Sequence, residues 1–211
     1  MIKITGYFHA QDLYKIAKKA AKSRGQRSDN AIIAIMFSVS ALEAFINESA
    51  GLARLVPTAQ RQPVIDGYAA VMRELEERKE SLLVKYHMGL LVFSGSTWNE
   101  GDQAFQDFKL LNAIRNAVVH MKPDRWESFV EEDKPDPQRP LDDYPKFIRA
   151  LRQRNVIDCP TNSESWLEVL RDKRVGEWSC QVAARISAAF EQSVPNGYFK
   201  SSLQNHIFER R

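Results

Sequence analysis

Three side chains that could act together on a phosphate group lie within one short segment, at Arg115, Asn116 and His120. An arginine guanidinium is permanently charged and binds phosphate through two parallel hydrogen bonds, whereas a histidine imidazole gains and loses protons near neutral pH. An asparagine amide can orient either group. Cleavage of RNA by its own 2′-hydroxyl needs a proton acceptor, a proton donor and a cation, but no metal. The segment predicts this chemistry, although the same spacing also arises by chance on ordinary helix surfaces.

The segment ends a predicted helix at residues 103–120, whose apolar stripe fixes where each polar side chain points. At about 100° per residue, the stripe that must face the core consists of Phe108, Leu111, Ile114 and Val118. Asn112, Asn116 and His120 fall on another side of the helix and follow one another at intervals of one turn. Arg115 lies at the margin of the apolar stripe, from which its long side chain can reach the polar side. Pro123 stops the helix next to the histidine.

Glu43 is a candidate for supporting these residues from a second helix. It interrupts an apolar run at residues 31–46, and a carboxylate is seldom buried in such a run without a partner. We interpret Glu43 as a buried hydrogen-bond partner, which is compatible with a second role in fixing Arg115 or tuning His120. Helix geometry places Asn112 one turn before Asn116, on the same side of the helix as His120. Glu43 and Asn112 are therefore predicted to support the segment from a second layer.

A basic stripe on the first predicted helix is a candidate for contact with an RNA backbone. Lysines recur there at helical spacing, and one more lysine follows the histidine. The residues concerned are Lys15, Lys18, Lys19, Lys22 and Lys122. A lysine stripe is more often a solvated face than a binding surface, so both interpretations stay open. No cluster of carboxylates, histidines or thiolates has the spacing of a metal site, and we predict neither a metal nor a cofactor.

Hydrophobic periodicity predicts helices along the whole chain. They are expected over residues 11–22, 31–55, 63–86, 103–120, 144–154, 163–173 and 175–192. The sequence contains no strand alternation of useful length, no internal repeat and no glycine-rich phosphate loop, so the predicted fold class is all-α. We expect a helical bundle over residues 1–124, a proline-rich linker or surface loop over 125–142, and a helical extension over 143–211 that packs on the bundle.

Composition favours a folded globular chain with a weakly basic surface. Of 211 residues, 44% are hydrophobic and 27% are charged, and the formal net charge of +3 neither demands nor excludes an anionic partner. Cys159 and Cys180 are expected to be reduced and structural. Residues 1–5 lack the pattern of a secretory signal, and the apolar run 31–46 falls short of the roughly 20 residues that a bilayer requires. We therefore expect a cytoplasmic protein without a membrane partner.

The segment at residues 115–123, Arg-Asn-Ala-Val-Val-His-Met-Lys-Pro, resembles the mark of the HEPN domain family. That mark is an arginine followed four to six residues later by a histidine, with a polar residue directly after the arginine. Residues 40–48 look like an early bundle helix of several members, and Trp166-Leu167 and residues 175–180 look like downstream helices of one bacterial subgroup. The resemblance covers about three quarters of the chain.

The resemblance implies an up-and-down helical bundle that dimerises and, in many members, a metal-independent endoribonuclease with its active site at the dimer seam. It assigns catalysis to Arg115, Asn116 and His120. It also implies that the protein is a toxin or phage-defence effector whose partners are RNA, a second copy of the chain and a cognate antitoxin protein. A two-fold dimer also answers a chemical objection, because one histidine cannot be both acid and base in the same step. Phe105 and Val119 are expected to help form the seam.

Two other interpretations of the same residues stay open. Other members of that family do not cut RNA and instead bind RNA, a nucleotide or a protein, and the polar face that ends at His120 could serve such binding. A purely structural helical module is the third interpretation. The joint presence of Arg115, Asn116 and His120 favours the enzyme.

Overall fold

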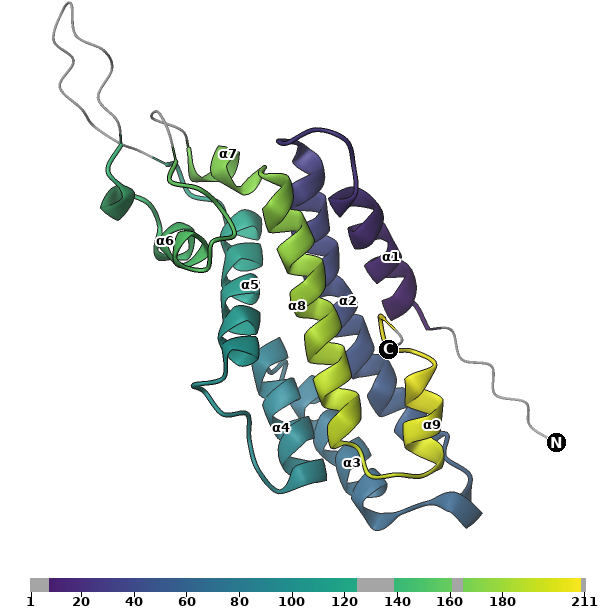
Figure 1. Cartoon of the computed structure of the whole chain (residues 1–211). Coiled ribbons are helices and arrows are strands. Elements are labelled where there is room, and N and C mark those ends of the chain that lie inside the picture. The colour runs from purple at the N-terminus through teal and green to yellow at the C-terminus, as the bar shows by residue number, and fades with distance from the viewer. Residues whose placement is uncertain (1–7, 125–138, 161–164, 210–211) are drawn as a thin grey trace, which may run out of the picture.

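The computed structural model describes residues 8–124, 139–160 and 165–209, and it is an elongated assembly of helices (Figure 1). Within those ranges no strand is present, and one isolated bridge joins Arg27 to Asp172. The predicted all-α fold class is confirmed. Residues 1–7, on which the expected absence of a secretory signal depends, lie outside the described residues.

The described residues form α-helices that follow in this order along the chain. They are α1 (Ala10–Ala21), α2 (Asp29–Arg54), α3 (Pro63–Glu77), α4 (Leu82–Ser94), α5 (Gln103–Val119), α6 (Lys146–Gln153), α7 (Trp166–Leu170), α8 (Lys173–Ser193) and α9 (Tyr198–Gln204). Single turns of 3-10 helix lie at Thr58–Gln60 and Leu141–Asp143. The helix expected over 163–173 is shorter than predicted, since Ser165 caps α7 in a capping box with Glu168, while residues 163 and 164 lie outside the described part.

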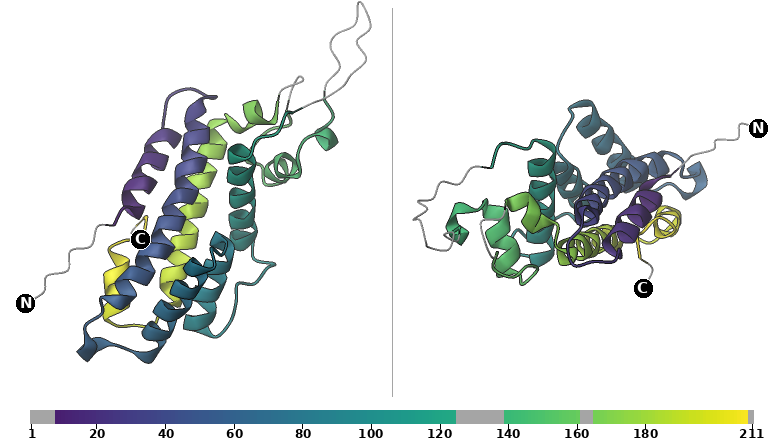
Figure 2. Two further views of the ribbon diagram at one scale, coloured as in Figure 1. Left: turned by 180° about the vertical axis from the view of Figure 1, so that it is seen from behind. Right: turned by 90° about the horizontal axis from the view of Figure 1, so that it is seen from above.

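The two longest helices, α2 and α8, form the centre of the molecule, with α1 on one flank and α5 on the other (Figures 1 and 2). Ser28 caps α2, since its side chain accepts a hydrogen bond from the backbone N–H of Asn30. Gly176 permits close packing of the two helices: a Cβ at this position would lie 3.2 Å from Cα of Ala31. A larger residue there would push α8 away from α2.

Helix α2 has the length and composition of a membrane-spanning segment. It contains 26 residues, more than the apolar run measured on the sequence, and its apolar window passes the hydropathy test for a span. Half of that window is buried inside the bundle, where α2 packs against α1, α3, α5 and α8. The argument from length against a membrane span is therefore wrong, whereas the expected role as a core helix agrees with the packing.

One long helix expected over residues 63–86 is two helices in the structure. Lys79 adopts a left-handed conformation with φ of 56°, which ends α3, and the N–H of Glu80 donates to the carbonyl of Leu75. Ser81 then caps α4 by accepting from the N–H of Val84. The apolar spacing continues through this turn, and so the sequence pattern alone did not reveal the break.

Helix α8 contributes to the same core as the helices that precede residue 124. Its apolar face is buried, at Trp178, Val182, Ile186 and Phe190. This helix packs against α1, α2, α4 and α5, so it fills the centre of the bundle and does not lie outside it as an added layer. Most of the expected linker, at residues 125–138, lies outside the described residues.

Helix α5 carries the segment of interest, and two kinds of contact hold it in place. Its predicted core positions Phe108, Leu111 and Ile114 are fully buried. Asp107, beside them, is also buried and accepts hydrogen bonds from Nε of Arg154 at 2.7 Å and from Nη2 of Arg185 at 2.8 Å. Arg154 is the C-cap residue of α6 and Arg185 lies within α8, so one carboxylate joins three parts of the chain.

Replacing Ile114 with Ala is expected to lower the free energy of unfolding by roughly 2 to 5 kcal/mol, because the side chain is fully buried and leaves a cavity. Val119→Ala on the same helix should change it by less than about 0.5 kcal/mol, because Val119 is 47% exposed. Urea unfolding followed by circular dichroism measures both. Equal losses in the two variants would contradict the buried face assigned to α5.

Candidate functional site

His120 lies at the point where α5 ends. It is the C-cap residue, and its N–H donates to the carbonyl of Asn116 at 2.9 Å, which closes the last turn. The side chain is exposed, and no described residue forms a hydrogen bond with its ring. Pro123 follows in irregular chain and prevents the helix from continuing. His120 therefore lies at an edge of the bundle with its ring open to solvent.

Arg115 and Asn116 are in direct contact beside this helix end. Nη1 of Arg115 donates to Oδ1 of Asn116 at 3.0 Å, which leaves the amide NH2 of Asn116 available as a donor. Nη2 of Arg115 lies 3.7 Å from a carboxylate oxygen of Glu43 on α2. The guanidinium thus connects α2 to the exposed face of α5, with its charge close to the polar side chains that precede His120.

Glu43 is not the buried partner that the sequence suggested. Its side chain is 48% exposed, because it lies on the solvent side of α2 where that helix meets α5. The expected contact with Arg115 is present, but at 3.7 Å and with this exposure it orients the arginine and contributes little stability. Asn112 is half-buried one turn before Asn116, and no hydrogen bond joins it to the other candidates in the described structure.

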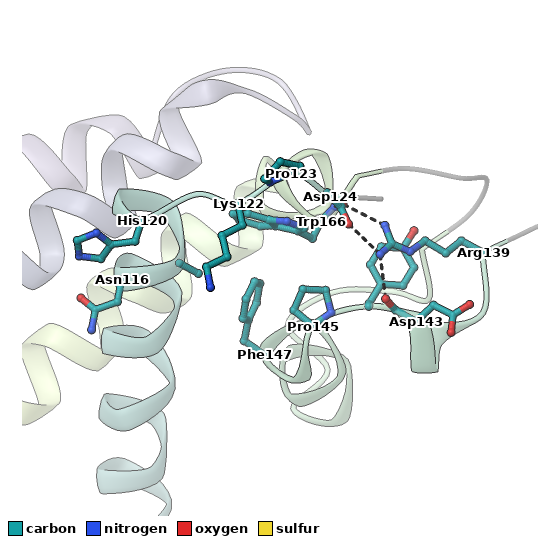
Figure 3. Close-up of a pocket in the computed structure, with 12 residues that line it drawn as sticks. Asn116, His120, Lys122, Pro123, Asp124, Arg139, Asp143, Pro145, Phe147 and Trp166 are labelled. Carbon is teal, nitrogen blue, oxygen red and sulfur yellow. Dashed lines mark hydrogen bonds and ion pairs between the residues drawn. The ribbon is translucent and has the colours of Figure 1, made fainter. Parts of the chain in front are cut away.

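A pocket of about 720 Å³ opens next to His120, between the end of α5 and the segment that carries α6 and α7 (Figure 3). Asn116, His120 and Lys122 line one side of it, and Phe147 and Trp166 line the other. In Figure 3, His120 and Asn116 point away from the aromatic side chains, and Lys122 lies between the two groups. A molecule in the pocket would reach His120 by passing Lys122.

An arginine clamp closes the far wall of this pocket. Arg139 is buried and forms a two-pronged ion pair with Asp124, at 2.9 and 3.0 Å, while Nη2 also donates to the carbonyl of Asp143. Its guanidinium lies 4.2 Å from the ring centre of Tyr144, and Asp124 also accepts the N–H of Trp166. The hydrogen bonds from Arg139 hold the pKa of Asp124 below its ordinary value. The clamp fixes Trp166 in the wall.

The basic stripe of α1 does not reach this site. Helix α1 packs on α2 and α8, on the flank opposite α5 (Figure 2). Lys15 pairs with Asp12 at 2.9 Å and Lys18 with Glu209 at 2.6 Å, while Lys19 and Lys22 are exposed. Lys122 is the candidate lysine that lies beside His120, since it lines the same pocket.

The two residues expected at a dimer seam differ in exposure. Val119 is 47% exposed, next to Met121 at 51%, so an apolar surface does lie beside His120. Phe105 is buried within the chain, with its ring against Trp98 and His87, and cannot contribute to a seam. The expectation for Phe105 is wrong because His87 of α4 and Trp98 of the connection before α5 cover its ring.

The arrangement can bind and polarise a phosphodiester and exchange protons with it, using only protein groups. No group of three or more histidine, cysteine, aspartate or glutamate side chains in the described ranges could hold a metal ion. Sequence reasoning missed Asp124, Arg139 and Phe147, since nothing in their local pattern marks them as neighbours of His120. Trp166 was noticed only as part of a resemblance, and its place in the pocket wall emerges from the structure.

Asp124→Asn is expected to destabilise the protein at neutral pH, because it removes the charge that Arg139 pairs with in a largely buried site. Because the folded-state pKa of Asp124 is lowered, its contribution is complete above about pH 4 and is lost as pH falls through that folded-state pKa. The stability difference between parent and variant should therefore narrow below about pH 4 in urea unfolding series. Asp142→Asn, at a side chain that is 89% exposed, is the control and should have little effect; a gap independent of pH would contradict the clamp.

The end of α5 thus combines a cation, an amide and an imidazole at the rim of a large pocket. Comparisons with known proteins find no counterpart, since no family model, no curated protein and no solved structure matches the chain. The function must be argued from these residues themselves.

Proposed function

We propose that this protein is a metal-independent endoribonuclease, built on a HEPN-like bundle and active as a homodimer. The observation that supports it is the gathering of Arg115, Asn116 and His120 at one exposed helix end, beside a pocket lined by the exposed Lys122. A cytoplasmic toxin or phage-defence effector, held in check by a cognate antitoxin protein, is the biological setting that we propose for such an activity.

The proposed reaction uses the RNA's own 2′-hydroxyl as the nucleophile. A base removes the 2′ proton, the 2′ oxygen bonds to phosphorus, and the bond from phosphorus to the 5′ oxygen breaks as an acid protonates that oxygen. Arg115 would bind the phosphate and offset the charge that develops on it, and the free NH2 of Asn116 would donate to a phosphate oxygen. Glu43 would orient Arg115 and does not touch the RNA.

A second copy of the chain would supply the second proton-transfer group. His120 is exposed and has no charged partner in the described structure, so one chain offers one imidazole at this site. A two-fold axis beside Val119 and Met121 would bury their apolar side chains and bring two copies of His120 to one cleft. One imidazole then acts as base and the other as acid.

A non-catalytic module that binds RNA, a nucleotide or a protein partner is the second candidate. The specific observation in its favour is the pocket of about 720 Å³, which is large enough for a small ligand whether or not His120 takes part. The two candidates differ in whether bound RNA is cut, and His120 is the residue that separates them.

The purified protein is expected to cut RNA in excess EDTA and to leave a 2′,3′-cyclic phosphate and a 5′-hydroxyl. His120→Ala and Arg115→Ala should each slow cleavage at least about 100-fold, because each removes a group that acts on the reacting phosphate. His120→Ala should leave the melting temperature unchanged, since the side chain is exposed, and Arg115→Ala nearly so. Gel analysis of end-labelled RNA and thermal denaturation measure these effects.

Matched controls are available for both side chains. His9→Ala changes an exposed histidine on the other flank, and Arg73→Ala changes an exposed arginine on α3. Both should cut at the parent rate. Activity that EDTA abolishes, or a variant of His120 that melts early yet stays active, would refute the site assignment.

Val119→Glu is expected to yield inactive monomers that keep their helical content, because it places an unpaired charge in the seam and not in the core. Size-exclusion chromatography with light scattering, circular dichroism and the cleavage assay measure the three properties. Ile16→Glu is the control, since Ile16 is similarly exposed on α1, and it should remain dimeric and active. Monomers that cleave at the parent rate would show that each chain carries a complete site, and Glu43 would then be the first residue to test as the missing acid or base.

A further inference from the structure

The pocket beside His120 has an aromatic wall that the proposed chemistry does not use. Phe147 of α6 and Trp166 of α7 meet edge to face, with ring centres 5.4 Å apart and an interplanar angle of 83°. Trp166 is 6% exposed and its backbone N–H is held by Asp124, so it backs the wall. Phe147 is only half-buried and presents its ring to the pocket.

Lys122 supplies a positive charge at the boundary between this wall and His120. It is exposed, it lines the pocket, and no carboxylate pairs with it in the described ranges. In Figure 3 its side chain extends between Asn116 and Phe147. Lys122 could therefore form an ion pair with the phosphate of a molecule in the pocket, next to His120, where we propose that cleavage takes place.

The pocket has the size and chemistry of a site for one nucleotide unit. Its volume of about 720 Å³ falls in the range of roughly 300 to 1,000 Å³ that is usual for small-molecule sites. Proteins recognise single-stranded RNA by stacking unpaired bases on aromatic side chains and by pairing lysine or arginine with the backbone. Phe147 and Lys122 offer this combination, and Asn116 and His120 continue the same surface.

We propose that the pocket takes one unpaired base of a single-stranded RNA, stacked on Phe147, with the adjoining phosphate at Lys122 and the next phosphodiester at His120. This inference rests on the proposed function and adds to it a substrate class, since a base held in a duplex cannot enter the pocket without leaving its stack. The arginine clamp at Arg139 keeps the wall in place before RNA binds.

The test measures binding apart from cleavage. A short fluorescein-labelled single-stranded RNA of mixed sequence is titrated with full-length protein carrying His120→Ala, and anisotropy reports the affinity. Adding Phe147→Leu, which keeps an apolar side chain but removes the ring face, should weaken binding roughly 5- to 150-fold. Tyr198→Leu, at an exposed aromatic residue on α9, should leave the affinity unchanged. The same RNA annealed to its complement should bind weakly, and with equal affinity, to the His120→Ala protein with and without Phe147→Leu.

A second variant does not depend on the packing of α6. Lys122→Gln changes an exposed residue of irregular chain, and it should reduce the slope of log affinity against log salt by about 0.7, the value for one contact to single-stranded phosphate. Lys79→Gln, at an exposed lysine in the turn between α3 and α4, should leave that slope unchanged. Thermal denaturation identifies any variant that is unfolded. If Phe147→Leu is unfolded, the salt slopes of Lys122→Gln and Lys79→Gln decide whether the pocket binds RNA.

The outcomes separate the two proposals. If the parent protein cuts RNA but Phe147→Leu and Tyr198→Leu bind alike, the base pocket is refuted and the nuclease stands. If the parent protein cuts nothing while Phe147→Leu and Lys122→Gln both lose binding to single strands, the pocket stands and the nuclease is refuted. Equal binding of duplex and single strand, or equal slopes for Lys122→Gln and Lys79→Gln, would overturn the inference.

Discussion

The geometry of the site depends on one buried carboxylate. Asp107 of α5 has a side chain that is 5% exposed and accepts hydrogen bonds from Arg154, Arg185 and Gln103. Loss of the partners of a buried carboxylate is strongly destabilising, so the C-terminal end of α6 and the middle of α8 cannot move away from α5 without a large cost in free energy. The pocket lies between the end of α5 and the segment that carries α6. Asp107 therefore limits how wide that pocket can become.

The outer side of the pocket is held in the same manner, by the pair of Asp124 and Arg139. Both contacts are short, largely buried and charge-assisted, and they fix the segments that they join through directional hydrogen bonds. The contact between Glu43 and Arg115 is longer and exposed, and His120 has no described partner at all. The protein thus combines a rigid wall with reactive groups that remain open to solvent, an arrangement suited to receiving a ligand or a second chain.

Most of the fold could be predicted from helical periodicity, because the spacing of apolar residues along the sequence shows which face of a helix is buried. It identified α2, α8 and the core face of α5. It failed at Lys79, because a left-handed residue that ends a helix is usually glycine and a lysine gives no such signal. It failed at Glu43 because an apolar run says how much of a helix is buried and not which side meets solvent.

Only part of the site could be predicted from the sequence, because some of its residues are neighbours on one helix and the others are far apart along the chain. Arg115, Asn116 and His120 are neighbours on one helix, so their spacing alone brings them together. The pocket wall comes from residues whose partners are remote along the chain: Asp124 accepts hydrogen bonds from Arg139, 15 positions away, and from the backbone N–H of Trp166, 42 positions away. The end of α5 at His120 joins the polar residues of this helix to the wall of the pocket. There the chain leaves the helix, and Lys122 and Asp124 line the pocket. A helix that continued for one more turn would point these side chains elsewhere, and the histidine and the aromatic wall would no longer share a surface.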